Sequence, residues 1–308
     1  MTEPPETAQL VEIPFDRSVT GETGKLIRVS PLVRRIIAGN PGPMTFKGTC
    51  TYAVGDGKVA IIDPGPDNPE HLAAMLAGLR GETVTAIFVT HTHKDHSPGA
   101  HALQAATGAR IFGCPPHGFS RQPSGHPIDA ANDSSYTPDT VLCEGETIDF
   151  KDFSLICVET PGHATNHRAF ALPQESALFS GDHVMAWSTT VVVPPDGAMR
   201  HYMASLAKLL MRDDKIYWPG HGGPVRQPRS FVQALIKHRR LREKSILARL
   251  EAGDTAIPAI VAKIYQGLDP ALTFAAALSV LAHLEDLVER GLVKTDAAVT
   301  LAAHYHPS

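Results

Sequence analysis

Four side chains of types that bind metal ions lie within six residues, in the segment His91-Thr92-His93-Lys94-Asp95-His96. Side chains two positions apart in an extended chain share a face, so His91, His93 and Asp95 can converge on one point. Imidazole and carboxylate ligands together suit zinc, and also iron or manganese. A polar loop that is rich in histidine by chance is the weaker interpretation of this spacing.

Three further His or Asp residues each follow a predicted strand and lie beside Gly or Pro, where a tight turn can direct the side chain. They are His163 after Thr160-Pro161-Gly162, Asp182 after Ser180-Gly181, and His221 after Pro219-Gly220. Each of them alone would more often be an ordinary turn residue. Together with the first segment, they predict one metal site built from distant parts of the chain.

The segments THTHKDH, TPGH, SGDH and PGHG, in this order, resemble the successive ligand motifs of the metallo-beta-lactamase superfamily. Asp63, in the segment Ile61-Ile62-Asp63-Pro64-Gly65, resembles the structural aspartate that follows an early strand in that family. The resemblance covers residues from about 40 to 225. It implies an α/β fold, namely a four-layer αββα sandwich with the metal ions at one edge.

The resemblance also implies a role for each candidate ligand. His91, His93 and His163 would hold one ion, Asp95, His96 and His221 would hold the other, and Asp182 would bridge the two. This set is similar to the glyoxalase II type of site. It implies two divalent ions as cofactors, zinc first, with iron or manganese as alternatives. We expect His183, the next residue, to be a pocket residue rather than an eighth ligand.

Two divalent ions roughly 3.5–4 Å apart can hold one hydroxide between them at neutral pH. We expect this hydroxide to attack an ester, thioester or lactone carbonyl, while the metals stabilise the oxyanion that forms. Asp95 is the expected catalytic residue, because it can orient the hydroxide as well as bind metal. The sequence contains no Gly-x-Ser-x-Gly elbow, so a serine nucleophile is not expected.

Other polar residues near these motifs have less certain roles. We expect the hydroxyl of Thr165 to support His163 through a hydrogen bond, as partners behind a ligand commonly do. His167 fits two interpretations, an orienting or substrate-contacting residue and an ordinary strand residue. His117 and His126 are expected at the surface.

The elements that position these residues alternate between strands and helices, which is typical of layered α/β folds. The β-branched run 84–90 predicts a strand directly before His91, and helical spacing predicts a helix over 69–79. Short apolar runs predict a second, more antiparallel sheet near 147–150, 153–159, 167–172 and 176–180. The segment 113–140, rich in Pro, Ser and Gly, predicts a long loop that shapes specificity.

The pattern changes after Pro228 to helices, followed by strand-like runs at 292–294 and 299–302. This order resembles a winged helix, so we predict a catalytic domain over residues 1–225 and a winged-helix-like domain over 226–308. Residues 226–250 contain eight Lys or Arg and a single Glu. Such a strip can attract phosphate backbones, although a solvated helix face is the simpler interpretation.

The composition is that of an ordinary globular protein, with 308 residues, 43% of them hydrophobic, and a net charge of −4. The four cysteines have no Cys-x-x-Cys spacing, which argues against a zinc finger or a redox motif. The N-terminus lacks the features of a signal peptide, and no apolar stretch is long enough to span a bilayer. A cytoplasmic protein without a membrane partner is therefore expected.

Three functions stay open. The first is hydrolysis of a small-molecule ester, thioester or lactone. The second is cleavage of single-stranded RNA, because the chain also resembles the beta-lactamase-like-2 group, which has an appended winged-helix-like domain and includes a single-strand endoribonuclease. The third is a non-catalytic nucleic-acid-binding module with structural metal, which seven intact ligands disfavour because structural zinc sites normally have four. The C-terminal domain is a candidate for covering the site or for forming a homodimer.

Overall fold

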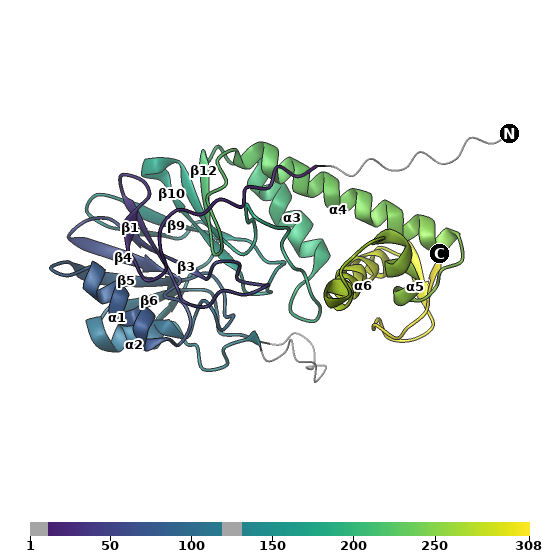
Figure 1. The fold of residues 1–308 in the computed structure, drawn as a ribbon, viewed down its shortest axis with the longest axis horizontal. Coiled ribbons are helices and arrows are strands. Elements are labelled where there is room, and N and C mark those ends of the chain that lie inside the picture. Colours follow the sequence, from purple (N-terminus) through teal and green to yellow (C-terminus); the bar gives the residue numbers. More distant parts are fainter. Residues whose placement is uncertain (1–11, 119–130) are drawn as a thin grey trace.

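Two β-sheets form the centre of the fold in the computed structural model, which describes residues 12–118 and 131–308 (Figure 1). The first sheet has the strand order β1 (Ile27–Arg28), β2 (Val33–Ile37), β3 (Cys50–Val54), β4 (Lys58–Ile62), β5 (Thr83–Val89), β6 (Arg110–Gly113) and β7 (Thr140–Val141). The second has the order β12 (Ile216–Pro219), β11 (Ala177–Gly181), β10 (Arg168–Leu172), β9 (Ser154–Glu159) and β8 (Thr147–Asp149). His126 and the middle of the predicted loop 113–140 lie outside the described residues.

Helices cover the outer face of each sheet, which gives the predicted four-layer αββα order (Figure 1). The helices α1 (Pro69–Gly78) and α2 (Gly99–Thr107) pack on the first sheet, and α3 (Met199–Leu210) and α4 (Pro228–Glu251) pack on the second. Large aromatic side chains fill the space between the sheets, among them Tyr52, Phe88, Phe170, Phe179 and Trp218. This buried aromatic area holds the two sheets face to face.

The parallel strands explain why the candidate ligands meet. Strand β5 pairs in parallel with β4 and β6, and β11 pairs in parallel with β12. Parallel strands are buried on both faces, which is why β5 is a nearly unbroken apolar run in the sequence. Their carboxyl ends point to one edge of the sandwich, where ligand-binding loops of α/β sheets lie.

The sequence analysis did not predict strand β2 of the first sheet. Strand β2 contains Arg34 and Arg35 in its centre, and two adjacent cations hide the apolar pattern that marks a strand. Arg35 is nevertheless 1% exposed, and its guanidinium donates to the backbone oxygen of Gly222 at 3.3 Å. A tertiary contact with the loop after His221 therefore allows a charged residue inside the sheet.

The C-terminal part has its own apolar core, at the end of the long helix α4 (Figure 1). It consists of α5 (Ile257–Ile264), the short 3-10 helix η3 (Pro270–Leu272), α6 (Thr273–Glu289) and the hairpin of β13 (Val293–Thr295) with β14 (Tyr305–Pro307). The expected strand at 299–302 is wrong, since the second strand begins at Tyr305. The Tyr305 ring is fully buried and its hydroxyl donates to Thr300, so this aromatic side chain fixes where the strand lies.

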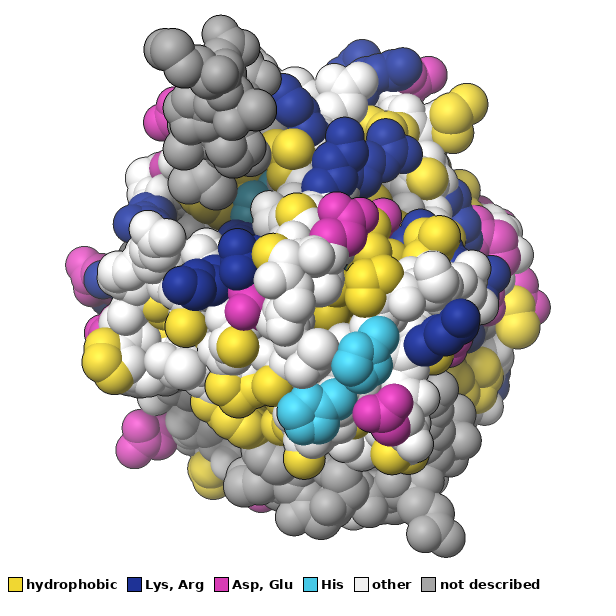
Figure 2. Space-filling view, turned by 90° about the vertical axis from the view of Figure 1, so that its right-hand side faces the viewer, with side chains coloured by type: hydrophobic (Ala, Val, Ile, Leu, Met, Phe, Trp, Pro, Cys, Tyr) yellow, Lys and Arg dark blue, Asp and Glu magenta, His cyan; other side chains and the backbone are white. Residues whose placement is uncertain are grey.

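The basic segment 226–250 forms most of α4, and its cations lie in different environments. Arg239 is buried, Arg249 pairs with Asp254, and the guanidinium of Arg242 lies 4.0 Å from the ring centre of Tyr265. Figure 2 shows the end of the molecule that carries the C-terminal part, where Lys and Arg side chains form separate groups with acidic and apolar side chains between them. Among residues 12–118 and 131–308, no helix combines the length and the apolar character that crossing a bilayer requires.

Candidate metal centre

All seven predicted ligands lie at one edge of the sandwich. His91, His93, Asp95 and His96 follow β5, while His163, Asp182 and His221 follow β9, β11 and β12. Their ligand atoms form three overlapping groups in which every atom lies within 4.8 Å of the others: His91, His93 and His163; His91, His96 and Asp182; and Asp95, His96 and His221. We call the first the trihistidine group and the third the carboxylate group.

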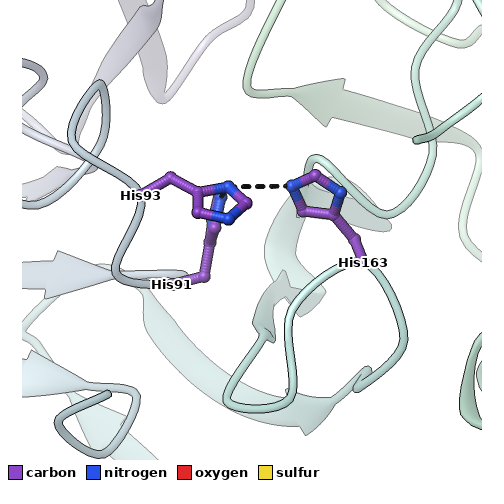
Figure 3. A group of neighbouring side chains, drawn as sticks. All are labelled: His91, His93 and His163. Atoms are coloured by element: carbon purple, nitrogen blue, oxygen red, sulfur yellow. Dashed lines mark hydrogen bonds between the residues drawn. The ribbon is translucent and has the colours of Figure 1, made fainter. Parts of the chain in front are cut away.

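The three rings of the trihistidine group point toward one another from two loops (Figure 3). Nδ1 of His93 lies 2.9 Å from Nε2 of His91 and 3.0 Å from Nε2 of His163. The other ring nitrogen of each histidine faces an acceptor. Nδ1 of His163 donates to the Val191 carbonyl at 2.7 Å, and Nε2 of His93 faces the Asp196 carboxylate at 3.6 Å.

The tautomer of His91 follows from a chain of three groups. The hydroxyl of Thr90 donates to Asp63 at 2.8 Å, so it can only accept from Nδ1 of His91, which lies 2.9 Å away. Nε2 of His91 then carries a lone pair. His93 and His163 direct their protons outward to Asp196 and Val191, so their inward nitrogens also carry lone pairs. Three lone pairs therefore converge within hydrogen-bond distance, and no proton lies between them. A cation satisfies this arrangement, because neutral imidazole is a common metal ligand.

The histidines of the carboxylate group also have hydrogen-bond partners at their outer nitrogens, but this group includes a carboxylate. Nδ1 of His96 donates to Asp63 at 2.9 Å, and Nδ1 of His221 faces the backbone oxygen of Gly48 at 3.3 Å. Their Nε2 atoms lie 3.3 Å apart, and Asp95 lies 3.1 Å from that of His221. Both imidazoles therefore present one nitrogen to the same point, next to a carboxylate.

Asp182 lies between the two groups. One carboxylate oxygen is 3.5 Å from Nε2 of His96, and the other is 3.4 Å from His221 and 3.7 Å from His163. Its Oδ1 is buried and has no hydrogen-bond partner among the described residues. A Cβ atom at Gly220 would lie 2.5 Å from this oxygen, so only glycine leaves room for the carboxylate there. A buried carboxylate oxygen without a donor fits a site that takes cations.

Burial and neighbouring charges give the two groups opposite electrostatics. Burial lowers the pKa of His163 to about 4, and burial with the neighbouring imidazoles holds the pKa of His91 well below 6.5. Burial also disfavours the charged form of His221, but Asp182 and Asp95 outweigh it and raise the pKa of His221 to about 10. The pKa of Asp182 is lowered despite burial, because His221 and His96 favour its carboxylate form.

Asp63 anchors both groups from the end of β4. Its carboxylate accepts from the backbone N–H and hydroxyl of Thr90 and from Nδ1 of His96, each at 2.8–2.9 Å. Its backbone φ is +49°, which is unusual for a residue other than glycine and directs the side chain back under the ligand loop. The sequence analysis had assigned this residue a structural role.

Asp196 is a part of the site that the sequence analysis missed. It is 9% exposed and accepts from the backbone N–H and hydroxyl of Thr165 at 3.0 and 2.9 Å, beside its contact with His93. Asp196 precedes Gly197 and follows two prolines, so in the sequence it looks like an ordinary turn residue. The expectation for Thr165 is wrong, because its hydroxyl bonds to Asp196, while His163 is held by Val191.

Three other histidines now have defined surroundings. His167 accepts from the backbone N–H of Asp182 at 3.2 Å, which favours the orienting role. His117 was expected at the surface, but its side chain is 4% exposed and lies 4.0 Å from Asp196. His183 is buried against the ring of Tyr202, with ring centres 4.7 Å apart, and belongs to none of the three ligand groups.

Access to this edge passes over two of the ligands. The side chains of Asp95 and His93 are 26% and 19% exposed, while those of His91, His96, His163, Asp182 and His221 are nearly or fully buried. A substrate therefore meets Asp95 and His93 first. The residues fit a pair of cations in donor type, in the direction of their lone pairs and in charge.

Comparisons with known proteins agree with this geometry. A family model described as the metallo-beta-lactamase superfamily matches residues 44–221, and one described as the beta-lactamase associated winged helix domain matches residues 256–300. The chain is similar in structure to a metallo-beta-lactamase family protein from Thermus thermophilus, with a TM-score of 0.73, 22% identity, and coverage of 91% of this chain and 100% of that one. A beta-lactamase domain protein from Burkholderia ambifaria has a TM-score of 0.77 and 20% identity, and the match covers 98% of this chain and 99% of that one.

Two relatives are more similar in sequence. An atrochrysone carboxyl ACP thioesterase from Aspergillus fumigatus is 32% identical over 229 residues, which is 72% of this chain and 66% of that protein. A beta-lactamase-like protein 2 homolog from Drosophila melanogaster is 30% identical over 283 residues, which is 87% of this chain and 91% of that protein. The chain therefore belongs to the metallo-beta-lactamase superfamily, and it carries the winged helix domain associated with that fold.

Proposed function

We propose that this protein is a binuclear metallo-hydrolase that cleaves an ester, thioester or lactone. The convergence of imidazole nitrogens on either side of Asp182 is the observation that carries the proposal. In the proposed assignment, the trihistidine group holds one ion, the carboxylate group holds the other, and Asp182 bridges them. Zinc suits these ligands best, and iron or manganese would also fit.

Two divalent cations at this site would activate water and polarise a carbonyl group. The residues of the chain itself orient the attacking water. Asp95 is the most exposed carboxylate of the site, and its pKa is lowered despite burial because His96 and His221 favour the charged form. An ionised Asp95 accepts a hydrogen bond from the attacking water and directs it toward the substrate above His93.

A thioester is the first substrate class to test. The relative from Aspergillus fumigatus is named a thioesterase, and the described site holds no nucleophilic serine or cysteine among its seven candidate ligands. Thioester carbonyls need only activated water and stabilisation of the oxyanion.

The domain division at residues 225 and 226, a cytoplasmic location and a homodimer stay predictions.

Cleavage of single-stranded RNA is the second candidate. The exposed cations of α4 favour it, because Arg229, Lys237, Arg240 and Lys244 line its solvent side and Arg226 is exposed just before it. Lys and Arg side chains bind phosphate backbones without regard to sequence. The same activated water would serve either reaction, so the substrate must be found by assay.

The test is one assay with two substrate sets. The purified full chain is given a panel of acyl thioesters, esters and lactones and a fluorogenic single-stranded RNA, each with and without a chelator. We expect thioester turnover that is lost with chelator and in His93→Ala, and kept in His201→Ala, whose histidine is exposed on α3. Turnover of RNA alone would replace the first proposal by the second. Turnover that survives chelation would contradict both.

A further inference from the structure

The loop between Asp182 and α3, residues 183–198, contacts both halves of the proposed metal site. The hydroxyl of Thr190 donates to the backbone oxygens of Asp182 and His183, each at 2.9 Å. The next residue, Val191, accepts from Nδ1 of His163 at 2.7 Å. Two adjacent residues of this loop therefore hold the backbone of Asp182 and one ring of the trihistidine group.

A buried arginine from outside the sandwich holds this loop. Arg239 lies in the middle of α4, is 4% exposed, and donates to the backbone oxygen of Thr190 and to Ser279 of α6, the latter at 3.5 Å. A buried guanidinium is costly unless its N–H groups are hydrogen-bonded, so its contacts with the loop and with Ser279 have to be well placed.

The ring of Tyr202 completes the connection. The guanidinium of Arg239 lies 5.3 Å from the ring centre of Tyr202 in α3, a cation–π distance. The backbone of Tyr202 packs so closely on the turn before His163 that a Cβ atom at Gly162 would lie 2.3 Å from its Cα. Arg239 thus contacts both segments that place His163: the loop that accepts its Nδ1 proton and the helix beneath its turn.

We propose that Arg239 is a positioning residue through which α4 and the C-terminal helices set the geometry of the metal centre. By fixing the Thr190 carbonyl, it holds the peptide that precedes Val191 and the hydroxyl that bonds to Asp182. Loss of Arg239 frees both contacts while leaving all seven ligands in place. The inference rests on the metal centre assigned under the proposed function.

The test measures metal affinity rather than turnover. Metal-free full-length protein is titrated with Zn²⁺ in competition with a chromophoric chelator, and the unfolding temperature is measured without metal. In Arg239→Met we expect about 10–100-fold weaker binding, with the larger loss at the trihistidine group. Arg239→Lys keeps a cationic donor for Thr190 and should recover most of the affinity. Arg240→Met, one position along the same helix and exposed, is the matched control and should change nothing.

Thr190→Val tests the same connection without altering α4. It removes the hydroxyl that bonds to Asp182, and we expect weaker zinc binding at temperatures far below unfolding. This variant decides the question if Arg239→Met does not fold. Unchanged affinity in Thr190→Val, or in a folded Arg239→Met, would overturn the inference and leave the metal centre standing. A wild-type chain that takes up no divalent cation would overturn both.

Discussion

The trihistidine group and the carboxylate group lie on either side of Asp182, yet they differ in charge. In the metal-free chain at neutral pH, the low pKa of His91 and of His163 makes both rings neutral. His96 and His221 have raised pKa values and form a protonated pair with Asp95 and Asp182. One half is a set of free lone pairs, whereas the other is a network of ion pairs.

This difference shows that a metal site can be organised in two ways before the metal arrives. Burial lowers the pKa of His91 and of His163, so a cation can bind at these two rings without displacing protons. In the carboxylate group, protons occupy the positions that the cation would take, and they hold Asp95 and His221 3.1 Å apart. Both halves are therefore preorganised, the first by burial and outward hydrogen bonds and the second by charge.

Of the changes considered, replacement of Asp182, the carboxylate between the two halves, should have the largest effect on zinc binding. We expect Asp182→Asn to weaken zinc binding in both halves by more than the roughly 10–100-fold that loss of a partner behind a ligand causes. The amide removes the negative charge that faces His96, His163 and His221. Metal content after dialysis checks this result, with Asp139→Asn, an exposed carboxylate outside the three ligand groups, as control. Two tightly held ions in Asp182→Asn would contradict the bridging assignment.

Removal of one ligand from each half should separate the two ions. We expect His163→Ala and His221→Ala each to retain one zinc ion per chain where the wild type holds two, and each to lose hydrolysis. The stoichiometry follows from the two groups sharing no histidine. Elemental analysis of the dialysed proteins gives the count. Loss of both ions in both variants would mean that the halves do not bind independently.

The residues behind the ligands should give smaller and selective effects. We expect Asp196→Asn to weaken only the trihistidine half, by about 10–100-fold, because its carboxylate faces His93 alone among the ligands. Asp63→Asn should weaken both halves, since Asp63 bonds to His96 directly and to His91 through Thr90. Competition titrations with a chelator measure both. If Asp196→Asn weakened zinc binding equally in both halves, Asp196 would not act on the trihistidine half alone.

The sequence indicated that the seven candidate ligands would meet, because His91 to His96 follow a strand directly, while His163, Asp182 and His221 each lie just after a strand and beside Gly or Pro. The carboxyl ends of parallel strands meet at one edge, so local order in the chain becomes proximity in space. His91 to His96 needed only the strand before them to be recognised. The alternation of apolar runs and helical spacing predicted a layered α/β fold, while the four-layer αββα order was implied by the resemblance to the family.

The supporting residues could not be predicted in this way. Asp196 looks like a turn residue, and Arg239 is one cation among seven in a helix whose solvent face is basic. What defines each of them is a contact with a residue at least thirty positions away, with Thr165 for the first and Thr190 for the second. The periodic patterns of the sequence do not indicate such contacts, because they depend on how the helices pack on the sheet.

The smallest expected effect is a difference in how the two halves respond to pH. His96 and His221 carry protons in the metal-free chain, because their pKa values are raised, and a cation must displace them. Affinity in the carboxylate half should therefore fall about tenfold per displaced proton for each pH unit below neutrality. The pKa of His163 is about 4 and that of His91 is held well below 6.5, so these two rings carry no such proton and affinity in the trihistidine half should vary less between about pH 6 and 8. Calorimetry of zinc binding to His163→Ala and His221→Ala, in two buffers of different ionisation enthalpy, counts the protons released. Equal proton release in the two variants would show that charge does not distinguish the halves.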